Sequence, residues 1–503
     1  MNVFELLTKN AKENPKKPSF VFKDQPVTFE QLREKIFKLA NGLDKLGVKP
    51  QDKVGIYLPN WPEYIYSYLA IFCLGATAVP LDYMLTEAEL ASCLGHCEAK
   101  FIIAKAKDIN VFKQLKADVS TLKDVILLDS PDKEFVNFGD LIEQSSYDFK
   151  ERNIDEEDLS IILYTSGTTG RPKGIMLSYR HLNAPCLATD HAVHFMPKDV
   201  IAGAVPFSHI AGLMYPLLSI YFGMTVTIME RFIPLRFLQA VEKYKATFFF
   251  LVPSMYYAIL QLKEFETFDL SSIRCVNVFG APNNPEVLRR FHQYCPHAHF
   301  INGWGLTETC GPSVVSPLGT ERLESVGLPM PWNEIKIVDD RDVELPRGKV
   351  GEVLFKSWTV MKGYFKDEEE TKKTIRDGWL YTGDLGKIDE EGYLYIVGRK
   401  KEMIKVSGEL VYATEVETAI GKHSQIKEIA VIGVPDKLRG EVVKAIISLK
   451  EGVKLTQEDI RYFAKEHLAH FKIPQIVEFM DNLPKTTSGK VDKAKLSELS
   501  RKS

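Results

Sequence analysis

The 503-residue sequence lacks the features of several protein classes. It contains no run of about eighteen apolar residues, and residues 1–9 are not a basic stretch followed by an apolar core, so we expect neither a membrane-spanning helix nor a leader. Its seven cysteines are an odd number spread over the chain, which argues against a disulfide framework and for a reducing compartment. The net charge of 64 − 67 = −3 is too small to attract nucleic acid or acidic membranes. We therefore expect a cytoplasmic protein with no nucleic-acid partner and at most peripheral membrane contact.

What the chain does contain is the composition of an ordinary globular protein, 45% hydrophobic and 26% charged. From residue 19 to residue 128, short apolar runs alternate with helical patterns, which is typical of layered α/β structure with much parallel sheet. From Gly327 the pattern changes to short strands with tight turns, as in antiparallel sheet. A charge cluster at 399–402 precedes a last hundred residues with their own alternation of strands and helices.

These patterns predict an α/β fold of two domains. Residues 1–400 are expected to form a large domain of layered α/β subdomains with a β-rich subdomain, and residues 401–503 a small, mobile α+β domain.

The most informative stretch follows an expected buried strand at 159–164. Glycines there permit close backbone approach, the hydroxyls add donors and Lys173 adds a positive charge, so the stretch can surround a phosphate. It is not the common nucleotide loop, because Pro172 stands where that loop needs glycine. A solvated linker has the same composition, so composition alone does not decide between the two. The stretch reads Thr165-Ser166-Gly167-Thr168-Thr169-Gly170-Arg171-Pro172-Lys173-Gly174.

Further polar turns follow other expected strands. Gly280-Ala281-Pro282 comes after the strand at 275–279, at the carboxyl end where ligands bind in open α/β sheets. Gly303 and Gly305 flank Trp304, so one face of its ring is expected to be open for stacking on a base. Thr307 and Glu308 then supply a hydroxyl and a carboxylate suited to a phosphate oxygen and Mg²⁺. An ordinary turn would explain the same residues.

Four other candidates are ambiguous by themselves. His209 precedes an apolar helical stretch and is either a satisfied core histidine or a pocket wall. Asp384 lies after Gly383 at a strand end and suits ribose hydroxyls, although structural carboxylates are more frequent. Lys490 ends a polar loop, where most lysines simply face solvent. Cys93, His96 and Cys97 lie within about one helical turn, but without a second pair nearby they are better explained as core residues.

Taken together, these motifs resemble the adenylate-forming superfamily of acyl-CoA synthetases, peptide-synthetase adenylation domains and luciferase. The phosphate loop, the Gly-Ala-Pro turn, Trp-Gly-Leu-Thr-Glu-Thr, Tyr-Thr-Gly-Asp, Gly-Arg and the terminal Pro-Lys-Thr-x-x-Gly-Lys occur in that family's order over essentially the whole chain. Trp304 departs from the more usual Tyr, a change that stacking tolerates. The overall pattern is similar to bacterial fatty-acid or aryl acyl-CoA ligases.

The resemblance implies an acid–CoA ligase that forms acyl-AMP and pyrophosphate from ATP and a carboxylic acid, first of all a fatty acid, and then transfers the acyl group to CoA. ATP, Mg²⁺ and CoA are the implied cofactors. Residues 165–173 would hold the β- and γ-phosphates, Thr307 the α-phosphate, Glu308 Mg²⁺, Trp304 and residues 280–282 adenine, and Asp384 and Arg399 ribose. Lys490 would lie between the acid and the α-phosphate, with His209 and Gly303 bordering the acid.

For the second half-reaction the resemblance implies a rotation of the small domain about Lys401. Lys405 and the loop of Ser407, Gly408 and Glu409 would then line a pantetheine tunnel. Two other functions stay open: loading of the acid onto a separate carrier protein, and a non-catalytic nucleotide or fatty-acid sensor. Intact Lys490, Glu308 and Lys173 argue against the sensor, because a pure binder needs no movable lysine.

Overall fold

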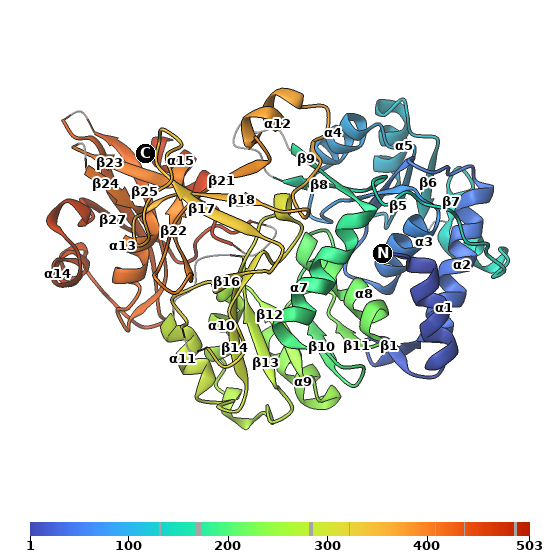
Figure 1. Ribbon diagram of the computed structural model, residues 1–503, viewed down its shortest axis with the longest axis horizontal. Helices are drawn as coiled ribbons and strands as arrows, with labels where there is room; N and C mark the ends of the chain where they lie inside the picture. The colour runs from blue at the N-terminus through green and yellow to red at the C-terminus, as the bar shows by residue number, and fades with distance from the viewer. Residues whose placement is uncertain are drawn as a thin grey trace.

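The computed structural model describes residues 1–129, 132–165, 173–280, 285–320, 322–407, 409–436, 438–486 and 490–502. Four sheets organise this part of the chain, with the small domain at one end of the molecule (Figure 1). Three of the sheets come from residues 18–399 and the fourth from residues 403–479. The layered α/β architecture with a β-rich part and a small α+β end is therefore confirmed. The division at residue 400 stays a prediction.

The eight-stranded sheet is mostly parallel and has the order β19-β9-β8-β4-β3-β5-β6-β7. Only its β8/β9 and β9/β19 pairs are antiparallel among the described strands. Its strands are β3 (Lys53–Tyr57), β4 (Thr77–Pro80), β5 (Phe101–Ala104), β6 (Asp124–Leu127), β7 (Val136–Asn137), β8 (Leu159–Thr165), β9 (Lys173–Ser178) and β19 (Gly363–Tyr364). Its crossovers and flanks are α2 (Phe29–Lys45), α3 (Pro62–Cys73), α4 (Glu87–Cys97), α5 (Ile109–Asp118) and α6 (Phe138–Glu143).

The nine-stranded sheet has the order β16-β15-β14-β13-β12-β10-β11-β1-β2, with a parallel centre and antiparallel ends. Its strands are β1 (Pro18–Phe22), β2 (Gln25–Thr28), β10 (Val200–Gly203), β11 (Thr225–Ile228), β12 (Phe248–Leu251), β13 (Cys275–Val278), β14 (His299–Trp304), β15 (Val314–Val315) and β16 (Leu328–Pro329). The helices beside it are α1 (Val3–Glu13), α7 (Ala184–Val193), α8 (Ile210–Phe222), α9 (Pro234–Tyr244), α10 (Pro253–Leu260) and α11 (Pro285–His292).

A single apolar core joins these two sheets. It includes residues of β3 and β5 from one sheet and of β12 and β14 from the other, with α2, α3, α7 and α8 between them. Separate clusters cover the outer faces, with α4 and α5 on the eight-stranded sheet and α9, α10 and α11 on the nine-stranded sheet. The strands with residues buried on both faces are therefore continuous apolar runs, as in parallel sheets generally. The helix α2 begins at a capping box formed by Thr28 and Gln31.

The β-rich part is a five-stranded antiparallel sheet formed by β17 (Glu334–Val338), β18 (Gly351–Lys356), β20 (Ile375–Arg376), β21 (Trp379–Ile388) and β22 (Leu394–Arg399). The charged helix α12 (Glu368–Thr374) begins at Asp367, whose side chain caps it. The small domain has a second five-stranded sheet made of β23 (Met403–Val406), β24 (Glu409–Tyr412), β25 (Ile426–Asp436), β26 (Gly440–Leu449) and β27 (Ile476–Phe479). Its helices are α13 (Ala413–Ile420), α14 (Gln457–His467) and α15 (Lys493–Lys502).

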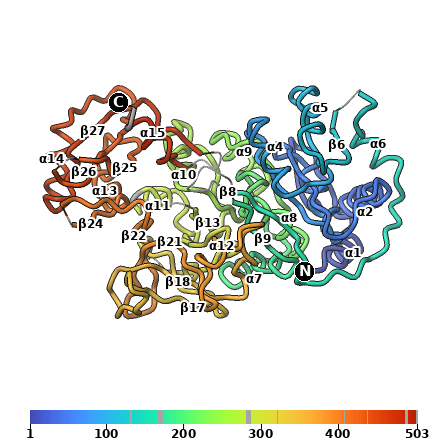
Figure 2. Tube along the Cα trace, turned by 90° about the horizontal axis from the view of Figure 1, so that it is seen from above, coloured from blue at the N-terminus to red at the C-terminus, as the bar shows by residue number. Residues whose placement is uncertain are grey.

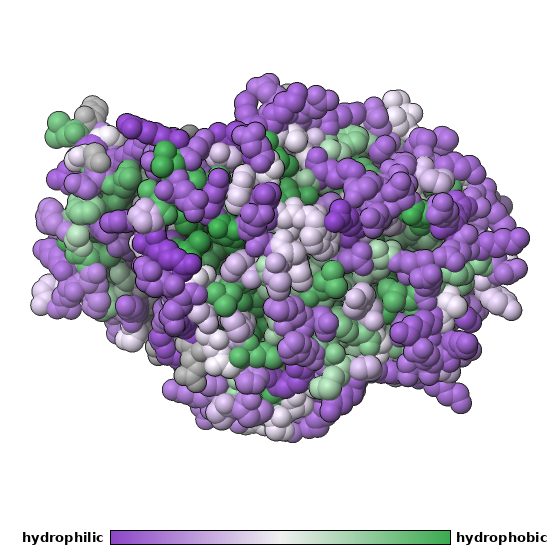
Figure 3. All heavy atoms as spheres, in the orientation of Figure 1, coloured by the Kyte–Doolittle hydropathy of each residue, from purple (hydrophilic) through white to green (hydrophobic). Residues whose placement is uncertain are grey.

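In the described part of the chain, no helix is both long and apolar enough to cross a bilayer. Hydrophilic side chains cover most of the face seen in Figure 3.

All seven cysteines are buried as free thiols, and burial raises the pKa of Cys97 to about 11. Cys93 and Cys97 pack into the outer core of the eight-stranded sheet, whereas His96 bonds the Tyr164 hydroxyl at 2.8 Å. These cysteines are core residues.

Candidate active site

The two domains meet at the carboxyl end of β13. Gly280 follows this strand with φ +82°, and a Cβ placed on it would lie 3.6 Å from Cε and 3.9 Å from Nζ of Lys490. Lys490 as a whole is exposed, but its ammonium end therefore reaches the turn of the large domain. Burial lowers the pKa of Lys490, nearby Arg399 acts in the same direction, and Asp384 opposes them. The predicted catalytic lysine thus lies beside Gly280, the described residue of the predicted nucleotide turn.

Asp384 and Arg399 lie side by side because they are register partners in the β21/β22 ladder. Arg399 Nε is 2.5 Å from Asp384 Oδ1, and Trp304 Nε1 donates to Asp384 Oδ2 at 2.7 Å. Burial raises the pKa of Asp384, while the charge of Arg399 and the hydrogen bond from Trp304 oppose that rise. The carboxylate is held at a fixed place, 4% exposed, with one charged and one neutral donor.

Trp304 differs from what its flanking glycines predict. It is only 7% exposed, and its ring meets Phe355 edge-on at 6.1 Å between centroids. The expected open ring face is therefore largely covered in this structure. The reason is the hydrogen bond to Asp384, which draws the indole against the β-rich sheet.

The phosphate side of the site is built on the β8/β9 hairpin, in which Thr165 and Lys173 are register partners. Lys173 forms an ion pair with Glu370 of α12, and its Nζ lies 5.0 Å from the ring centroid of Tyr364. The Tyr364 hydroxyl donates to Glu308 Oε1 at 3.1 Å. A chain of contacts thus links the hairpin lysine to the predicted metal ligand.

Thr307 and Glu308 belong to one 3₁₀ turn, Thr307–Thr309, where both are half-buried. The backbone N–H of Met361 donates to the Glu308 carbonyl at 2.8 Å and fixes that turn on the β-rich part. The sequence signals missed Tyr364 and Glu370, because neither belongs to a polar turn after a parallel strand. Some predicted residues lie outside the described residues, namely Ser166, Gly167, Thr168, Thr169, Gly170, Ala281, Pro282 and Gly408.

His209 is the cap residue before α8. Its Nε2 is buried, has no hydrogen-bond partner among the described residues and lies 3.7 Å from Oδ2 of Asp82, which follows β4. Burial lowers the pKa of His209, Asp82 raises it, and the Lys490 ammonium lowers it further. His209 is therefore not the satisfied core histidine that its apolar surroundings suggest, and it lies within electrostatic reach of Lys490.

Lys401, Lys405, Ser407 and Glu409 do not join this cluster. All four are exposed: Lys401 on the 3₁₀ turn Lys400–Glu402, Lys405 in β23, Ser407 just after β23 and Glu409 at the start of β24. The small domain forms one end of the molecule in both views, and β24 lies at its outer side (Figures 1 and 2). Lys405 is anchored through its backbone N–H, which donates to Glu441 Oε2 at 2.9 Å.

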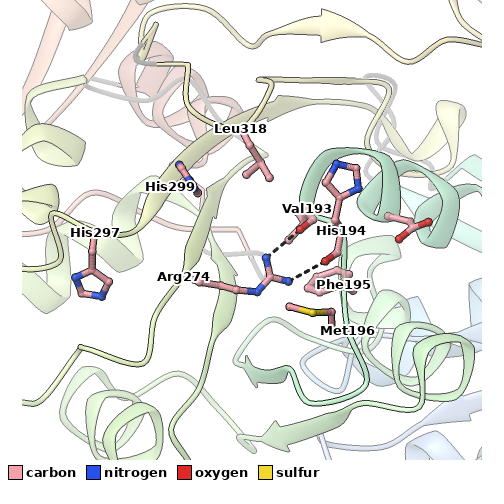
Figure 4. A pocket seen from close by; sticks show the side chains of 9 residues that line it. Val193, His194, Phe195, Met196, Arg274, His297, His299 and Leu318 are labelled. Carbon is pink, nitrogen blue, oxygen red and sulfur yellow. Dashed lines mark hydrogen bonds between the residues drawn. The ribbon is translucent and has the colours of Figure 1, made fainter.

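A cavity of about 520 Å³ lies at the opposite, amino end of β13 and β14 (Figure 4). Arg274 is bonded there to the carbonyls of Val193 and His194. Its Nε and Nη2 also reach the Asp199 carboxylate at 2.8 and 2.6 Å. Burial alone would raise the pKa of Asp199, but hydrogen bonds from Arg274, the Met196 backbone and Thr247 hold it below its usual value. This cavity is bordered by a satisfied structural network.

Comparisons with known proteins show which family the chain matches and which relatives it has. Residues 7–365 match the family model described as AMP-binding enzyme, and residues 415–490 match the AMP-binding enzyme C-terminal domain. The chain is 34% identical to a long-chain-fatty-acid–CoA ligase of Bacillus subtilis (98% of this chain, 93% of the relative). It is 33% identical to a 4-coumarate–CoA ligase of Humulus lupulus (93% and 90%).

Two solved structures are similar over nearly their whole length. The anthranilate CoA ligase AuaEII in complex with anthranoyl-AMP superposes with a TM-score of 0.93 at 27% identity, covering 100% of this chain and 98% of that one. ATP-bound MatB from Rhodopseudomonas palustris superposes with a TM-score of 0.91 at 30% identity, covering 99% of each chain.

Proposed function

Because the chain belongs to the AMP-binding enzyme family, we propose that it is an AMP-forming acid–CoA ligase. It would activate a carboxylic acid with ATP and pass the acyl group to the thiol of CoA. The observation that carries this proposal is the meeting of Lys490, from the small domain, with Gly280, Asp384 and Arg399 of the large domain. Relatives named as CoA ligases support the same conclusion.

In the first half-reaction a carboxylate oxygen of the acid attacks the α-phosphorus of ATP. A new P–O bond forms, the bond between the α-phosphorus and the bridging oxygen breaks, and pyrophosphate leaves. Two anions must approach each other, so a cation between them lowers the barrier. Lys490 is the residue we assign to this place. Asp384 and Arg399 would hold the ribose, and Gly280 would let the backbone come close to the nucleotide.

The phosphate groups need positive charge and donors at the other end of the site. Lys173 would turn from Glu370 toward the β- and γ-phosphates, together with Thr165 and the residues that follow it. Glu308 is a carboxylate beside the phosphate hairpin, with Tyr364 bonded to one of its oxygens, and this fits a ligand of Mg²⁺. The metal would supply charge neutralisation for the triphosphate, and Thr307 would contact the α-phosphate.

In the second half-reaction the CoA sulfur attacks the acyl carbon of the adenylate. The C–S bond forms, the C–O bond to AMP breaks, and the thiol proton is released. Lys490 lies beside Gly280, the residue that we assign to the border of the nucleotide. We therefore propose that the small domain rotates about Lys401 before the thiol enters. Lys405, Ser407, Gly408 and Glu409 would then face the pantetheine arm.

The acid is either a fatty or an aryl acid. The sequence favours a fatty acid. The relatives include ligases named for long-chain fatty acids and for 4-coumarate, so both classes of acid are represented among them. His209 and Gly303 are the residues we assign to the border of its binding site. Loading of a separate carrier protein is the alternative outcome for the acceptor.

The proposal is tested by incubating purified protein with ATP, Mg²⁺ and a panel of straight-chain and aromatic acids. Pyrophosphate is measured first without an acceptor, and AMP and thioester are then measured with CoA or with a carrier protein. We expect acid-dependent pyrophosphate release and CoA-dependent AMP formation. Preferential use of the carrier protein would move the acceptor to the alternative, and no AMP with any acid would overturn the function.

A further inference from the structure

The lysine that we assign to the β- and γ-phosphates already has a counter-ion within the protein. Lys173 begins β9, and its ammonium forms an ion pair with the carboxylate of Glu370 on α12. The two side chains are 21% and 31% exposed, so salt screens this pair less than it screens pairs at the surface. Lys173 is the only ion-pair partner of Glu370 among the residues that the structure describes. Glu370 therefore neutralises a charge that the phosphates of ATP would need.

The backbone of α12 holds Glu370 in this place. The Glu370 N–H donates to Oδ1 of Asp367, the cap of the helix, at 3.0 Å. The Thr371 hydroxyl accepts from the Tyr364 N–H at 2.9 Å and donates to the Asp367 carbonyl at 2.8 Å. These bonds fix the first turn of α12 on β19, the strand that pairs with β9. The helix lies beside β9 in both views (Figures 1 and 2), so the position of Glu370 is set by the fold.

Tyr364 of β19 brings a second carboxylate close to the same lysine. Its register partner in β9 is Ile175, two residues after Lys173, and Lys173 Nζ lies 5.0 Å from its ring centroid. The Tyr364 hydroxyl donates to Glu308 Oε1 at 3.1 Å. Burial raises the pKa of Tyr364, and the charges of Glu308 and Glu370 add to that rise. One lysine and two carboxylates thus surround one tyrosine.

This balance of charges changes when a polyphosphate enters the site. Lys173 has to leave Glu370 to reach the β- and γ-phosphates, and the Glu370 carboxylate is then left beside another anion. Like charges repel each other more strongly where water is partly excluded. Glu308 is assigned to Mg²⁺, so its charge is compensated when the metal is bound, whereas Glu370 loses its ion-pair partner. AMP has neither a β- nor a γ-phosphate and does not require Lys173.

We propose that Glu370 is a positioning residue of the ATP site that holds Lys173 while the site is empty and competes with the β- and γ-phosphates for its ammonium. This inference rests on the proposed function and goes beyond it, because Glu370 lies outside the nucleotide motifs. Glu370 lowers the affinity for ATP. After the first half-reaction it takes Lys173 back, which favours the release of pyrophosphate.

The first measurement is calorimetric binding of ATP, pyrophosphate and AMP to the whole chain, each with Mg²⁺ and without an acid. Glu370→Gln removes the charge and keeps the size of the side chain and the backbone hydrogen bond to Asp367. We expect the Kd values for ATP and pyrophosphate to fall about threefold, since one partly exposed ion pair no longer opposes binding. The Kd for AMP should not change, and the Tm should stay near the wild-type value.

The matched control is Glu369→Gln, which removes the same charge from the neighbouring residue of α12. Glu369 pairs with Lys373 at 2.5 Å, and its side chain is 82% exposed. It has no contact with Lys173, and salt screens so exposed a charge, so all three Kd values should stay within about 1.5-fold of the wild type.

The second measurement follows the acid-dependent reaction. Glu370→Gln should lower the KM for ATP and leave the KM for the acid and for CoA unchanged. Pyrophosphate should inhibit the variant about threefold more strongly than the wild type, because its binding is tightened in the same way as that of ATP. Glu370→Ala is a second variant without the charge and should give the same changes.

The inference is overturned if the Glu370 variants bind ATP as the wild type does or more weakly. Weaker binding would show that Glu370 presents Lys173 to the phosphates. An equal gain for AMP, or an equal gain in Glu369→Gln, would also overturn it, because the effect would then be one of net charge. These results leave the ligase function intact, since AMP is still formed from ATP and acid. A wild-type protein that neither binds ATP nor forms AMP would instead contradict the proposed function itself.

Discussion

The two edges of the parallel part of the nine-stranded sheet differ in how far their polar residues are hydrogen-bonded. At the amino edge, Arg274 and Asp199 make a bidentate pair, and Asp199 accepts further bonds from Thr247 and the Met196 backbone. At the carboxyl edge, His209 Nε2 is buried with no hydrogen-bond partner among the described residues, and the Lys490 ammonium that acts on it comes from another domain.

This difference distinguishes polar residues that stabilise the fold from polar residues that are available to a ligand. A buried charge that is fully bonded holds elements together and has no capacity left for a ligand. A buried polar atom without a partner weakens the folded state and is retained where a substrate completes it. Figure 4 shows the residues that line the cavity at the amino edge, yet the chemistry is expected at the other edge.

The largest effect is expected for Lys490→Ala. Removing the cation between the acid and the α-phosphate should lower acid-dependent pyrophosphate exchange by about 10²- to 10³-fold. Thioester formation from supplied acyl-AMP should be largely spared, because we assign Lys490 to the first half-reaction only. Equal loss of both half-reactions would show that the carboxyl edge does not work as assigned.

Asp199→Ala should lower stability and spare activity, in contrast to Lys490→Ala. It leaves the Arg274 guanidinium without its carboxylate, so we expect a loss of about 3 kcal/mol in the free energy of unfolding, seen as a lower Tm. Activity per folded molecule should stay near the wild-type value. Lys245→Met, which removes an exposed ion pair with Asp269, is the control and should keep nearly wild-type stability. If Asp199→Ala were as stable as this control, the amino edge would not be a stabilising network.

Lys401→Pro tests whether the carboxyl edge is completed by a moving domain. Proline fixes φ at the proposed hinge, so adenylation should stay within about twofold while thioester formation falls by at least about tenfold. The two half-reactions are measured separately, by pyrophosphate exchange and by thioester formation from acyl-AMP. A normal rate of thioester formation would contradict the hinge.

The smallest effect concerns pH. Because burial lowers the pKa of His209, the folded protein binds fewer protons than the unfolded chain below the unfolded value of about 6.5, and stability falls as the pH falls. Asp82 and Lys490 are the charged groups that act on it. His209→Gln should therefore lose less Tm between pH 7.5 and pH 5 than the wild type. Some dependence should remain, since burial also lowers the pKa of His181.

Much of the fold followed from local pattern. The strands expected at 159–164 and 275–279 occur as β8 (Leu159–Thr165) and β13 (Cys275–Val278), and short antiparallel strands follow Gly327 as expected. These elements depend on periodicity and on contacts within a few residues. The sheet orders did not follow, because pairing of β1 with β11, some two hundred residues later, depends on long-range contacts.

The candidate site divides in the same way. Gly280, Thr307 and Glu308 were visible as turn residues after parallel strands, because ligands collect at such ends. Asp384, expected at a strand end, lies instead within β21 and faces Arg399 of β22. Tyr364 and Glu370 carried no local signal, since each acquires its meaning through a partner far away in the chain.

By itself the sequence determined the chemical groups of this protein: a hydroxyl- and glycine-rich hairpin, carboxylates and glycines after strands, and a lysine near the end of the chain. Tertiary structure alone decided which of these groups meet. Residues 280 and 490 become neighbours, and His209 becomes buried beside Asp82, only when sheets from distant segments pack around one core. The physical reason is that local pattern sets secondary structure, whereas proximity and burial come from contacts between segments far apart in the chain.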